Sequence, residues 1–447
     1  MMKQSANLVC VNPKCRKTFP IKSSQLKCDK CDFLLDVEYK DTPSTKLKET
    51  FLQRRNSALI YDESGVWRFR ELLNFVEIET EEIDQCSKFL VSLDGAEGRQ
   101  SKPYHMSKVS NFINIDNDNL MLQPEGYNPS GSFKDNGMST AVTHAKMMNA
   151  KKIICASTGN TSASAGMFAA NENMQCDVYI PDGQIAPGKL SQAYQFGTQM
   201  IKVNGNFDDA FTKSLEAAKQ VGSYTVNSVN PFRIEGQKTI PFRALEFLNW
   251  KIPDWIVYPG GALGNISSCG KCLIELHRWG WIKKIPRIAV VNAEGANTLY
   301  QLYNGKFEDE ELRWNHGMPN LELVEKYYHA MNQNEKLKPK TKATAIQIGK
   351  PANITKGLRA LEFTNGVVIQ VSDKEMLDGM SAVGLNGFDC EMASGATVAG
   401  IKKLLDDEII KKDDKTIGIL TGRQKEPMLP IEYHNDPNNK FAVPPKS

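Results

Sequence analysis

The sequence predicts an α/β protein with parallel sheets, preceded by a small cysteine-rich unit. Three observations support this fold class. Short apolar strands alternate with helical patterns from about residue 120 onward, four cysteines gather within residues 1–40, and 41% of the 447 residues are hydrophobic, as in ordinary globular proteins. A chain of this length is expected to form two or three domains.

Composition excludes several classes of partner. The formal net charge is only +3, so charge gives no reason to expect a nucleic-acid or membrane partner. No apolar run reaches the ~18 residues that span a bilayer, and "MMKQSANLVCVNPKC" lacks the apolar core of a secretory signal. We therefore expect a cytoplasmic protein acting on a small molecule. Its ten cysteines are expected to be thiols or metal ligands rather than disulfides. A homodimer is compatible with the sequence, which does not fix the oligomeric state.

The first unit, residues 1–40, carries a metal-site pattern. Cys10 and Cys15 form C-x4-C, and Cys28 and Cys31 form C-x2-C. Two such pairs on tight turns can close a tetrahedral four-sulfur site. Forty residues bury little apolar surface, so a bound metal ion is expected to stabilise this unit. We predict a structural zinc ribbon; a rubredoxin-like iron site and four thiols that never meet are the alternatives.

The following strands are continuous and apolar, which is typical of parallel sheets covered on both faces. They read "KKIICAS", "CDVYIPDG", "QMIKVNG", "DWIVYPGG", "RIAVVNAEG", "GVVIQVSD" and "KTIGILTG". Ligands of such sheets bind at the carboxyl ends of the strands. Residues 304–342 differ: they are polar and weakly periodic, and predict a partly helical surface insertion with a mobile "NQNEKLKPKTK" tip.

One lysine stands in an unusual setting. "NPSGSFKDNG" surrounds Lys134 with turn formers and small residues and places it just inside a predicted helix start. Lysine is usually a solvated surface residue, so the question is whether this amine is held in a pocket. Asp135 beside it is either a functional partner or a simple helix cap.

Two loops predict anion sites. "ASTGNTSASAG" ends a strand and opens a helix, and Ser157, Thr158 and Thr161 add hydroxyl donors to the helix N-terminus. Ordinary capping is the alternative. "YPGGALGNISS" has the same strand–glycine loop–helix order and predicts a cradle for a phosphate. A dinucleotide site is disfavoured, because Glu294 lies further on than the ~20 residues expected and the glycine spacing differs.

Two further motifs complete the set. "NSVNPFRIEGQKT" offers Arg233 as a bidentate phosphate ligand beside Asn227 and Ser228, with a surface loop as the alternative. "GILTGRQKEP" ends a strand at Thr421, whose hydroxyl is more often a cap or turn residue. A lysine and a phosphate cradle suit a Schiff base with a phosphorylated aldehyde, and the remaining groups suit a substrate carboxylate and phosphate.

On these motifs the chain resembles the threonine synthase family, within the tryptophan-synthase-β-like group of fold type II pyridoxal-phosphate enzymes. The likeness covers nearly the whole chain, including "GVWRFRELL", "GYNPSGSFKDNGM", "APGKLSQAYQFGTQMIKVNGNFDDAF", "IQIGKPANITKGLRALE" and "CEMASGATVAG". It implies two three-layer α/β/α domains behind the ribbon. The expected limits are 1–40 for the ribbon, 41–125 for a lead-in and part of the large domain, 126–235 for the small domain and 236–447 for the large domain.

The resemblance also implies residue roles. Lys134 would be the Schiff-base lysine and proton shuttle, and Asn160 would hydrogen-bond the cofactor's 3-oxygen. Thr421 would face the pyridine nitrogen, where a hydroxyl would not enforce a positive charge. The larger sets are the cofactor-phosphate loop Gly260, Gly261, Gly264 and Asn265; the substrate-carboxylate group Ser157, Thr158 and Thr161; and the substrate-phosphate group Asn227, Ser228 and Arg233.

The implied reaction converts O-phospho-L-homoserine and water into L-threonine and phosphate, with pyridoxal phosphate as cofactor. The chain departs from the usual family sequence at Asn136, where Arg is usual, and at Ala262, where Asn is common. The segment "GAEGRQSKPY", called the lead-in below, lacks the Thr-Pro pair of the family. "TGRQKEP" stands where a histidine-containing variant is common. β-Replacement on a phosphoserine-like substrate, as in cysteate synthases, would keep every cofactor residue. A catalytically silent metabolite-binding homologue is the other alternative. Cys269 and Cys272 are expected to be core residues of a helix.

Overall fold

The computed structural model describes residues 6–76, 90–182, 187–205, 207–305, 320–333 and 338–443, and the chain forms two compact units. The first unit combines the chain up to Gln100 with Asn128–Glu246, and the second combines Ser101–Tyr127 with the chain from Phe247 onward. The domain limits expected from the sequence, near residues 40, 125 and 235, stay a prediction.

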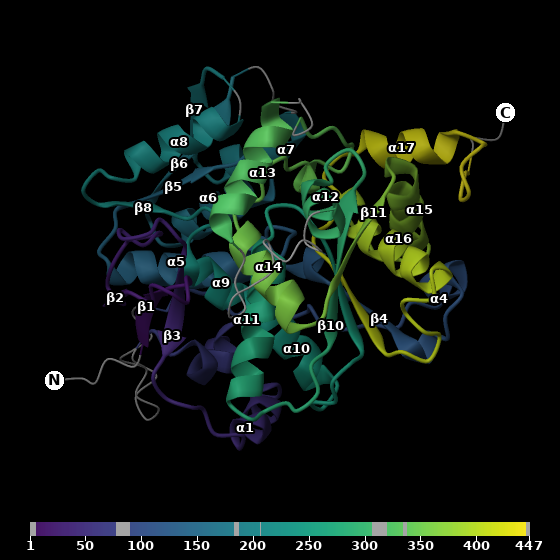
Figure 1. Cartoon of the computed structure of the whole chain (residues 1–447), viewed down its shortest axis with the longest axis horizontal. Helices are drawn as coiled ribbons and strands as arrows, with labels where there is room; N and C mark the ends of the chain where they lie inside the picture. Colours follow the sequence, from purple (N-terminus) through teal and green to yellow (C-terminus); the bar gives the residue numbers. More distant parts are fainter. Residues whose placement is uncertain are drawn as a thin grey trace. The chain divides into compact units, whose positions relative to one another are not determined.

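A small antiparallel sheet opens the first unit. Its strand order is β2 (Thr18–Pro20), β1 (Ala6–Cys10) and β3 (Leu35–Tyr39), and β1 pairs with both neighbours. Leu8, Leu35 and Val37 are fully buried, so the sheet packs on the rest of the unit instead of standing alone. Figure 1 shows these strands in purple beside α5 and α9.

His144 anchors the small sheet to the helices. Its neutral ring donates from Nε2 to the carbonyl of Ile21 over 2.8 Å, and its Nδ1 accepts from the Tyr224 hydroxyl over 2.7 Å. The ring also stacks on Phe232, with centroids 3.5 Å apart. Burial lowers the pKa of His144 to about 3. The histidine is therefore a neutral core residue that joins three elements.

The second sheet of this unit is parallel, as the apolar strand pattern predicts. Its order is β7-β6-β5-β8. The strands are β5 (Lys152–Ala156), β6 (Gln175–Pro181), β7 (Gln199–Val203) and β8 (Ser223–Thr225). The helices are α1 (Leu47–Arg54), α2 (Ile60–Glu63), η1 (Trp67–Leu73), α5 (Lys134–Met147), α6 (Asn160–Asn171), α7 (Pro187–Gln195), α8 (Phe207–Ala217), α9 (Pro231–Gln237) and α10 (Thr239–Phe247). The core of the sheet consists of β-branched and aliphatic side chains such as Ile153, Val178 and Ile180.

The second unit has a five-stranded parallel sheet in the order β11-β10-β9-β12-β4. Its strands are β4 (Leu120–Pro124), β9 (Trp255–Pro259), β10 (Arg287–Ala293), β11 (Val367–Val371) and β12 (Thr416–Leu420). Its helices are α4 (Ser107–Ile113), η2 (Asn117–Asn119), η3 (Glu125–Tyr127), α11 (Gly264–Arg278), α12 (Thr298–Gly305), α13 (Leu321–Gln333), η4 (Thr344–Ile346), α14 (Ile354–Phe363), α15 (Asp373–Gly384), α16 (Met392–Asp406) and α17 (Met428–Asn435). Figure 1 shows α11 and α14 on one side of the strands and α15 and α16 on the other.

The predicted α/β fold class is confirmed: the described chain contains two parallel sheets, and a small antiparallel sheet with a four-cysteine cluster precedes them. In the second unit, β12 lies beside β9 in parallel, with Gly418 opposite Val257. The loops that follow these two strands, at Gly260 and Thr421, therefore leave the sheet at the same edge.

The predicted insertion contains a helix. α13 buries Val324, Tyr328 and Met331, so this part of residues 304–342 packs on the unit. Residues 306–319 and 334–337 lie outside the described residues, as does part of the tip expected to be mobile. Further along that tip, Lys340 donates its backbone N–H to the carbonyl of Gly295 over 2.7 Å.

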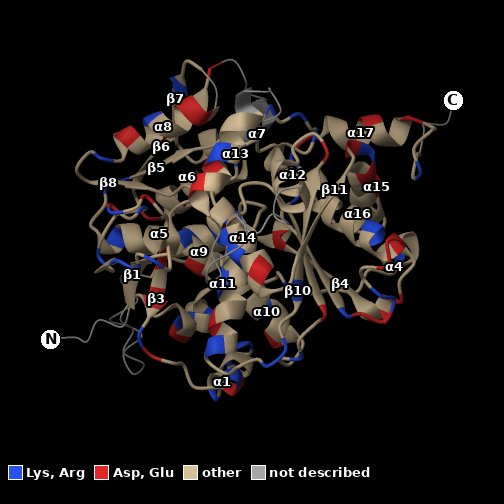
Figure 2. Ribbon diagram, in the orientation of Figure 1, with Lys and Arg blue, Asp and Glu red and all other residues tan. Residues whose placement is uncertain are grey.

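The surface carries both signs of charge. Figure 2 shows Lys and Arg interspersed with Asp and Glu over the described chain, in keeping with the net charge of +3. None of the helices in the described segments combines the length and apolar character that a membrane crossing needs.

Candidate active site and metal centre

Lys134 is the first residue of α5, which confirms the predicted helix start. The loop before it is held by Asp135, which is fully buried and accepts two hydrogen bonds from Ser130: 2.7 Å from the N–H and 2.6 Å from the hydroxyl. Gly131 takes a φ of 85°, which glycine adopts without strain. Lys134 itself is only half-buried, and its Nζ lies 4.2 Å from the centroid of the Phe133 ring. The backbone is thus fixed, and the lysine side chain keeps partial exposure to solvent.

Asn136, which stands where the family usually has Arg, belongs to a buried polar network. Its Nδ2 donates to the carbonyl of Phe133 over 3.0 Å, and its Oδ1 accepts from Arg243 over 3.1 Å. The same Arg243 nitrogen donates to the carbonyl of Gly65 over 3.0 Å. Sequence reasoning missed Arg243; a lone arginine inside the apolar helix "TIPFRALEF" was its only signal. A guanidinium from another helix thus braces the first turn of α5.

The unusual lead-in segment touches the loop that precedes Lys134. The N–H of Gly98, in "GAEGRQ", donates to the Asn128 side chain over 2.8 Å. Asn128 begins the "NPSGSFKDNG" motif and is buried. The lead-in therefore supports the lysine loop, whichever substrate the chain uses.

The loop between β5 and α6 is the predicted carboxylate site. Ser157, Thr158, Asn160 and Thr161 are half-buried, whereas the strand before them is buried. Gly159 donates its N–H to Ser157 Oγ over 3.2 Å, and a Cβ added at Gly159 would meet no atom within 4 Å. The start of this 12-residue helix is therefore reachable by a ligand, and helix-terminal N–H groups with hydroxyls suit an anion.

Asn227 orients that loop from the neighbouring segment. Its Oδ1 accepts from the N–H of Ala156 over 3.0 Å, and its Nδ2 donates to the carbonyl of the same residue over 2.9 Å. Both polar groups of the amide thus contact the end of β5. Ser228, the next residue, is half-buried. The structure brings Asn227 to the carboxylate loop, and its role toward a substrate phosphate stays a prediction.

Arg233 lies in α9, which begins with Asn230 accepting from the N–H of Phe232. The surface-loop alternative is wrong, because every residue of α9 is buried. Arg233 Nη1 donates to the carbonyl of Val226 over 2.7 Å, while Nε and Nη2 have no hydrogen-bond partner among the described residues. Burial lowers the pKa of Arg233 to about 10, although Cys155 and Asp135 nearby oppose this. A buried cation with two unsatisfied donors is a fit for an anionic ligand.

The predicted phosphate cradle joins β9 to α11 in the second unit. Gly260 donates its N–H to Val291 over 2.7 Å, and a Cβ there would come within 2.6 Å of the Val290 side chain, so only glycine fits. Leu263 takes a φ of 63°, a backbone conformation uncommon for a bulky residue. Such outliers persist where the surrounding structure enforces them, often at ligand sites.

Asn265, in the first turn of α11, is the side chain of this loop that best fits a ligand. It is buried, and neither its Oδ1 nor its Nδ2 has a hydrogen-bond partner among the described residues. Ala262 and Gly264 of the same loop are half-buried, so the loop is reachable. An unsatisfied amide at the N-terminus of a helix of 15 residues fits a phosphate group.

Thr421 follows β12 and is buried. Its hydroxyl donates to Glu391 Oε1 over 2.9 Å and lies 3.2 Å from the Ser394 hydroxyl. Sequence reasoning missed both partners, although they stand in the quoted stretch "CEMASGATVAG". Cys269 and Cys272, on α11, are fully buried, as expected.

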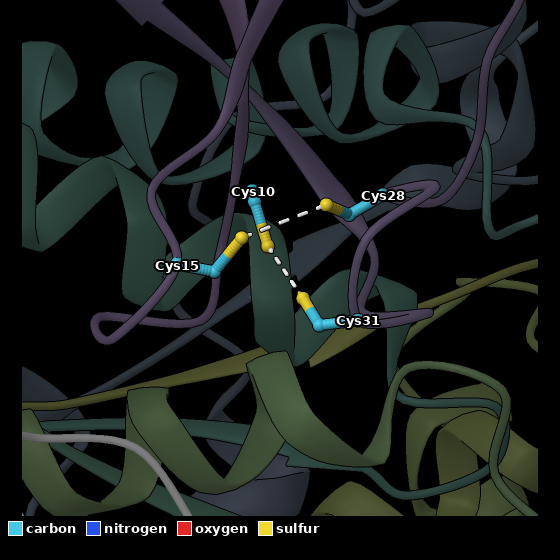
Figure 3. Close-up of side chains that lie close together, drawn as sticks. All are labelled: Cys10, Cys15, Cys28 and Cys31. Atoms are coloured by element: carbon cyan, nitrogen blue, oxygen red, sulfur yellow. Dashed lines mark hydrogen bonds between the residues drawn. The ribbon is translucent and has the colours of Figure 1, made fainter.

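The four cysteines of the ribbon converge, as predicted. Figure 3 shows their sulfur atoms pointing toward one another from two turns. Cys10 and Cys31 are 3.4 Å apart at sulfur, Cys15 and Cys28 are 3.7 Å apart, and all four sulfurs lie within 4.8 Å of one another. A tetrahedral metal with bonds of about 2.3 Å sets its sulfur ligands about 3.8 Å apart. The cluster therefore has the donor set and size for one metal ion, and no disulfide joins the described cysteines.

Comparisons with known proteins agree with this geometry. A family profile described as "Pyridoxal-phosphate dependent enzyme" matches residues 103–422. The threonine synthase of Methanocaldococcus jannaschii is 34% identical over 427 residues, covering 95% of this chain and 94% of the relative. That of Methanosarcina acetivorans is 34% identical, covering 92% of this chain and 90% of the relative. The solved structure of processed threonine deaminase isoform 2 from Solanum lycopersicum has a TM-score of 0.56 at 17% identity and covers 80% of this chain and 94% of that one.

Proposed function

Because this chain belongs to the family of pyridoxal-phosphate-dependent enzymes, we propose that it is a threonine synthase, which converts O-phospho-L-homoserine and water into L-threonine and phosphate. The proposal is supported by relatives that carry this name and match nearly the whole length of both chains. It is also supported by a donor set that suits a substrate with a carboxylate at one end and a phosphate at the other.

The residues assigned to the cofactor are those that the family resemblance implies. Gly260, Gly261, Gly264 and the unsatisfied amide of Asn265 would hold its phosphate, Asn160 its 3-oxygen, Thr421 its ring nitrogen and Lys134 its aldehyde carbon. When bound, pyridoxal phosphate supplies an electron sink that stabilises negative charge at the carbons of an amino-acid substrate.

The chain itself binds and orients the substrate. Ser157, Thr158 and Thr161, with the first turn of α6, would hold the carboxylate, and Asn227 fixes this loop through Ala156. Lys134 would take the proton from the substrate's α-carbon and later return it. Asp135 keeps the lysine loop in place through Ser130.

The main support for a phosphorylated substrate is the environment of Arg233. Its guanidinium is buried and two of its donors are unsatisfied, so an anionic ligand would supply the missing partners. With Ser228 nearby in sequence, it would receive the phosphate that leaves in the reaction. The four-cysteine cluster would hold Zn²⁺ in a structural role, since all four ligands come from the protein.

A substrate panel tests the proposal. The protein loaded with pyridoxal phosphate is given O-phospho-L-homoserine, O-phospho-L-serine, serine or threonine, and the amino-acid product and free phosphate are measured. Threonine with one equivalent of phosphate, from phosphohomoserine alone, is the expected result. Turnover of phosphoserine alone would instead indicate β-replacement, and cofactor binding without any turnover would indicate a silent homologue.

A matched pair of variants completes the test. Lys134→Ala should abolish turnover while leaving the fold intact. Lys146 lies on the same helix, where the half-buried lysine pairs with Glu172 over 2.7 Å, and Lys146→Ala is the control. It should keep the activity of the native protein. Equal loss in both variants would mean that damage to α5, and not loss of one amine, explains the effect.

A further inference from the structure

The cysteine ribbon, residues 1–40, ends in a strand that contacts α9. β3 packs against this helix, which also carries Arg233 (Figure 1). The hydroxyl of Tyr39, the last residue of β3, donates to Glu235 Oε2. The same carboxylate oxygen pairs with Lys238 Nζ over 2.7 Å, and this nitrogen lies 4.9 Å from the centroid of the Tyr39 ring. One tyrosine of the ribbon thus contacts both members of an ion pair at the end of α9.

This ion pair lies entirely inside the protein. The side chains of Glu235 and Lys238 have no exposed surface. A buried charge pair loses its hydration, so it depends on close geometry and on further hydrogen bonds from its surroundings. The Tyr39 hydroxyl supplies such a hydrogen bond from 196 residues earlier in the chain. The ribbon therefore helps to set the position of Glu235, and with it the position of α9.

Arg233 lies on another face of the same helix. Residues two apart in a helix do not share a face, so Arg233 and Glu235 meet different neighbours. The Arg233 side of α9 packs on the first turn of α5, where a Cβ added at Gly137 would come within 2.9 Å of Arg233 Nε. A Cβ added at Gly236 would overlap the carbonyl oxygen of Asn136. The two helices approach so closely that any shift of α9 moves the guanidinium relative to α5.

A second contact joins the ribbon to α9. His144 contacts the carbonyl of Ile21, which lies between the two cysteine pairs, and its ring stacks on Phe232. Thr140 of α5 donates its hydroxyl to the carbonyl of Phe232 over 2.7 Å. Phe232 directly precedes Arg233, so the backbone at the arginine is held by contacts that include the ribbon.

The cysteine cluster holds the strands that make these contacts. Cys10, the last residue of β1, is opposite Leu35, the first residue of β3, and Ala6 is opposite Tyr39 at the other end of the pair. Cys31 lies in the turn before β3. A metal ion bound by the four sulfurs would join this turn to the end of β1 and so fix the strand that carries Tyr39.

We propose that the ribbon positions the site that receives the substrate phosphate, and that Tyr39 is the positioning residue through which it acts. Tyr39 holds Glu235 and α9, so that Arg233 stays aligned for an anion. This inference rests on the proposed function, which assigns Arg233 to the phosphate. It gives the ribbon a role in substrate affinity in addition to its role in stability.

Calorimetric titration with inorganic phosphate tests this inference on the full-length protein loaded with metal and cofactor. The cofactor fills its own phosphate cradle, so added phosphate reports on the site at Arg233, and Arg233→Met should abolish its binding. Tyr39→Phe removes one hydroxyl and keeps the ring beside Lys238. It should raise the dissociation constant for phosphate about fivefold or more. It should also raise KM for phosphohomoserine and leave kcat nearly unchanged, as expected when only binding is weakened.

Tyr433→Phe is the matched control. Tyr433 is also a buried tyrosine whose hydroxyl donates to a carboxylate, that of Asp378, but both residues belong to the second compact unit. This variant should bind phosphate with native affinity. An unchanged affinity in Tyr39→Phe, or an equal loss in Tyr433→Phe, would overturn the inference.

Removal of the metal by a chelator gives a second test. The metal-free native protein should lose phosphate affinity as Tyr39→Phe does. Removing the metal from Tyr39→Phe should add little, because both changes break the same chain of contacts. A further loss as large as that in the native protein would refute the path through Tyr39. If the metal-free protein does not keep its native circular dichroism, the titration of metal-loaded Tyr39→Phe decides alone.

The inference and the proposed function fail in different ways. If Arg233→Met abolishes phosphate binding and Tyr39→Phe leaves it unchanged, the role of the ribbon is refuted while the phosphate site stands. If the loaded native protein binds no phosphate, or Arg233→Met binds it with native affinity, the assignment of Arg233 in the proposed function is refuted, and the inference with it.

Discussion

Replacing Arg233 by methionine should improve the stability of the ligand-free protein, or leave it unchanged, while ruining phosphate binding. The guanidinium is buried, and burial lowers its pKa from the usual arginine range to about 10. At ~1.4 kcal/mol for each pKa unit, keeping this charge in the folded state costs about 3 kcal/mol. Arg233→Met removes that cost and also the bond to the Val226 carbonyl, worth about 1.5–3 kcal/mol. The two contributions are of similar size and opposite sign, so the free energy of unfolding should stay unchanged or rise slightly in the variant.

The effect on the substrate should be much larger and opposite in sign. Nε and Nη2 are the two donors left for a phosphate, and charge-assisted hydrogen bonds contribute about 1.5–3 kcal/mol each. Losing both should lower kcat/KM for phosphohomoserine by roughly 10²–10⁴-fold. Urea unfolding of the ligand-free protein and phosphate-release kinetics measure the two effects separately.

Arg243→Met is the matched control. Arg243 is also a buried arginine, but one nitrogen donates to Gly65, Asn136 and Thr239, over 3.0–3.1 Å. Removing it should leave buried acceptors unsatisfied and destabilise the protein by about 2–4 kcal/mol. If Arg233→Met destabilises as much as Arg243→Met and leaves the substrate kinetics unchanged, Arg233 is a structural residue and the reasoning is wrong.

Three further predictions concern the core, the cradle and the ribbon. The pKa of His144 is lowered from 6.5 to about 3, so the unfolded state takes up the proton first as the pH falls. The contribution of His144 to stability should therefore be complete above pH 6.5 and fall by ~1.4 kcal/mol per pH unit down to pH 3. His144→Gln should flatten this slope in acid unfolding curves, and an unchanged slope would refute the role of the histidine. Asn265→Ala should weaken pyridoxal-phosphate binding about 10-fold or more in fluorescence titrations, since a charged phosphate loses a donor. Gly260→Ala should also weaken binding, because its Cβ would clash with Val290 and displace the cradle. Native affinity in both variants would contradict the cradle assignment. Cys28→Ala should lose one equivalent of bound metal and several degrees of melting temperature. Cys390→Ala, in the buried core, should keep the metal. Equal metal content in the two variants would show that the four-cysteine cluster is not the metal site.

Features with a local signal could be predicted from the sequence. The strands "KKIICAS" and "DWIVYPGG" are continuous apolar runs, and both became buried parallel strands within a residue or two of the expected ends. The helix start at Lys134 follows from the turn formers before it. The C-x4-C and C-x2-C spacing was enough to predict that the sulfur atoms of the four ribbon cysteines lie close together.

Features made by tertiary pairing could not be predicted. β8 has three residues, too short for a periodic pattern, and exists because β5 offers it a hydrogen-bonding edge. Glu391 is thirty residues from Thr421, and only the pairing of α16 with the end of β12 brings the carboxylate to the hydroxyl. Arg243 reaches Asn136 over more than a hundred residues. In each case no local rule of spacing encodes the contact.

The central assignment is that one amine, Lys134, bonds the aldehyde of pyridoxal phosphate. Borohydride reduction of the loaded protein, followed by proteolysis and peptide mass spectrometry, tests it most directly, because reduction makes the bond permanent. We expect a single phosphopyridoxyl group, on the peptide that contains "NPSGSFKDNG", at Lys134. A label on any other lysine, or no label in a protein that retains the cofactor, would contradict the assignment.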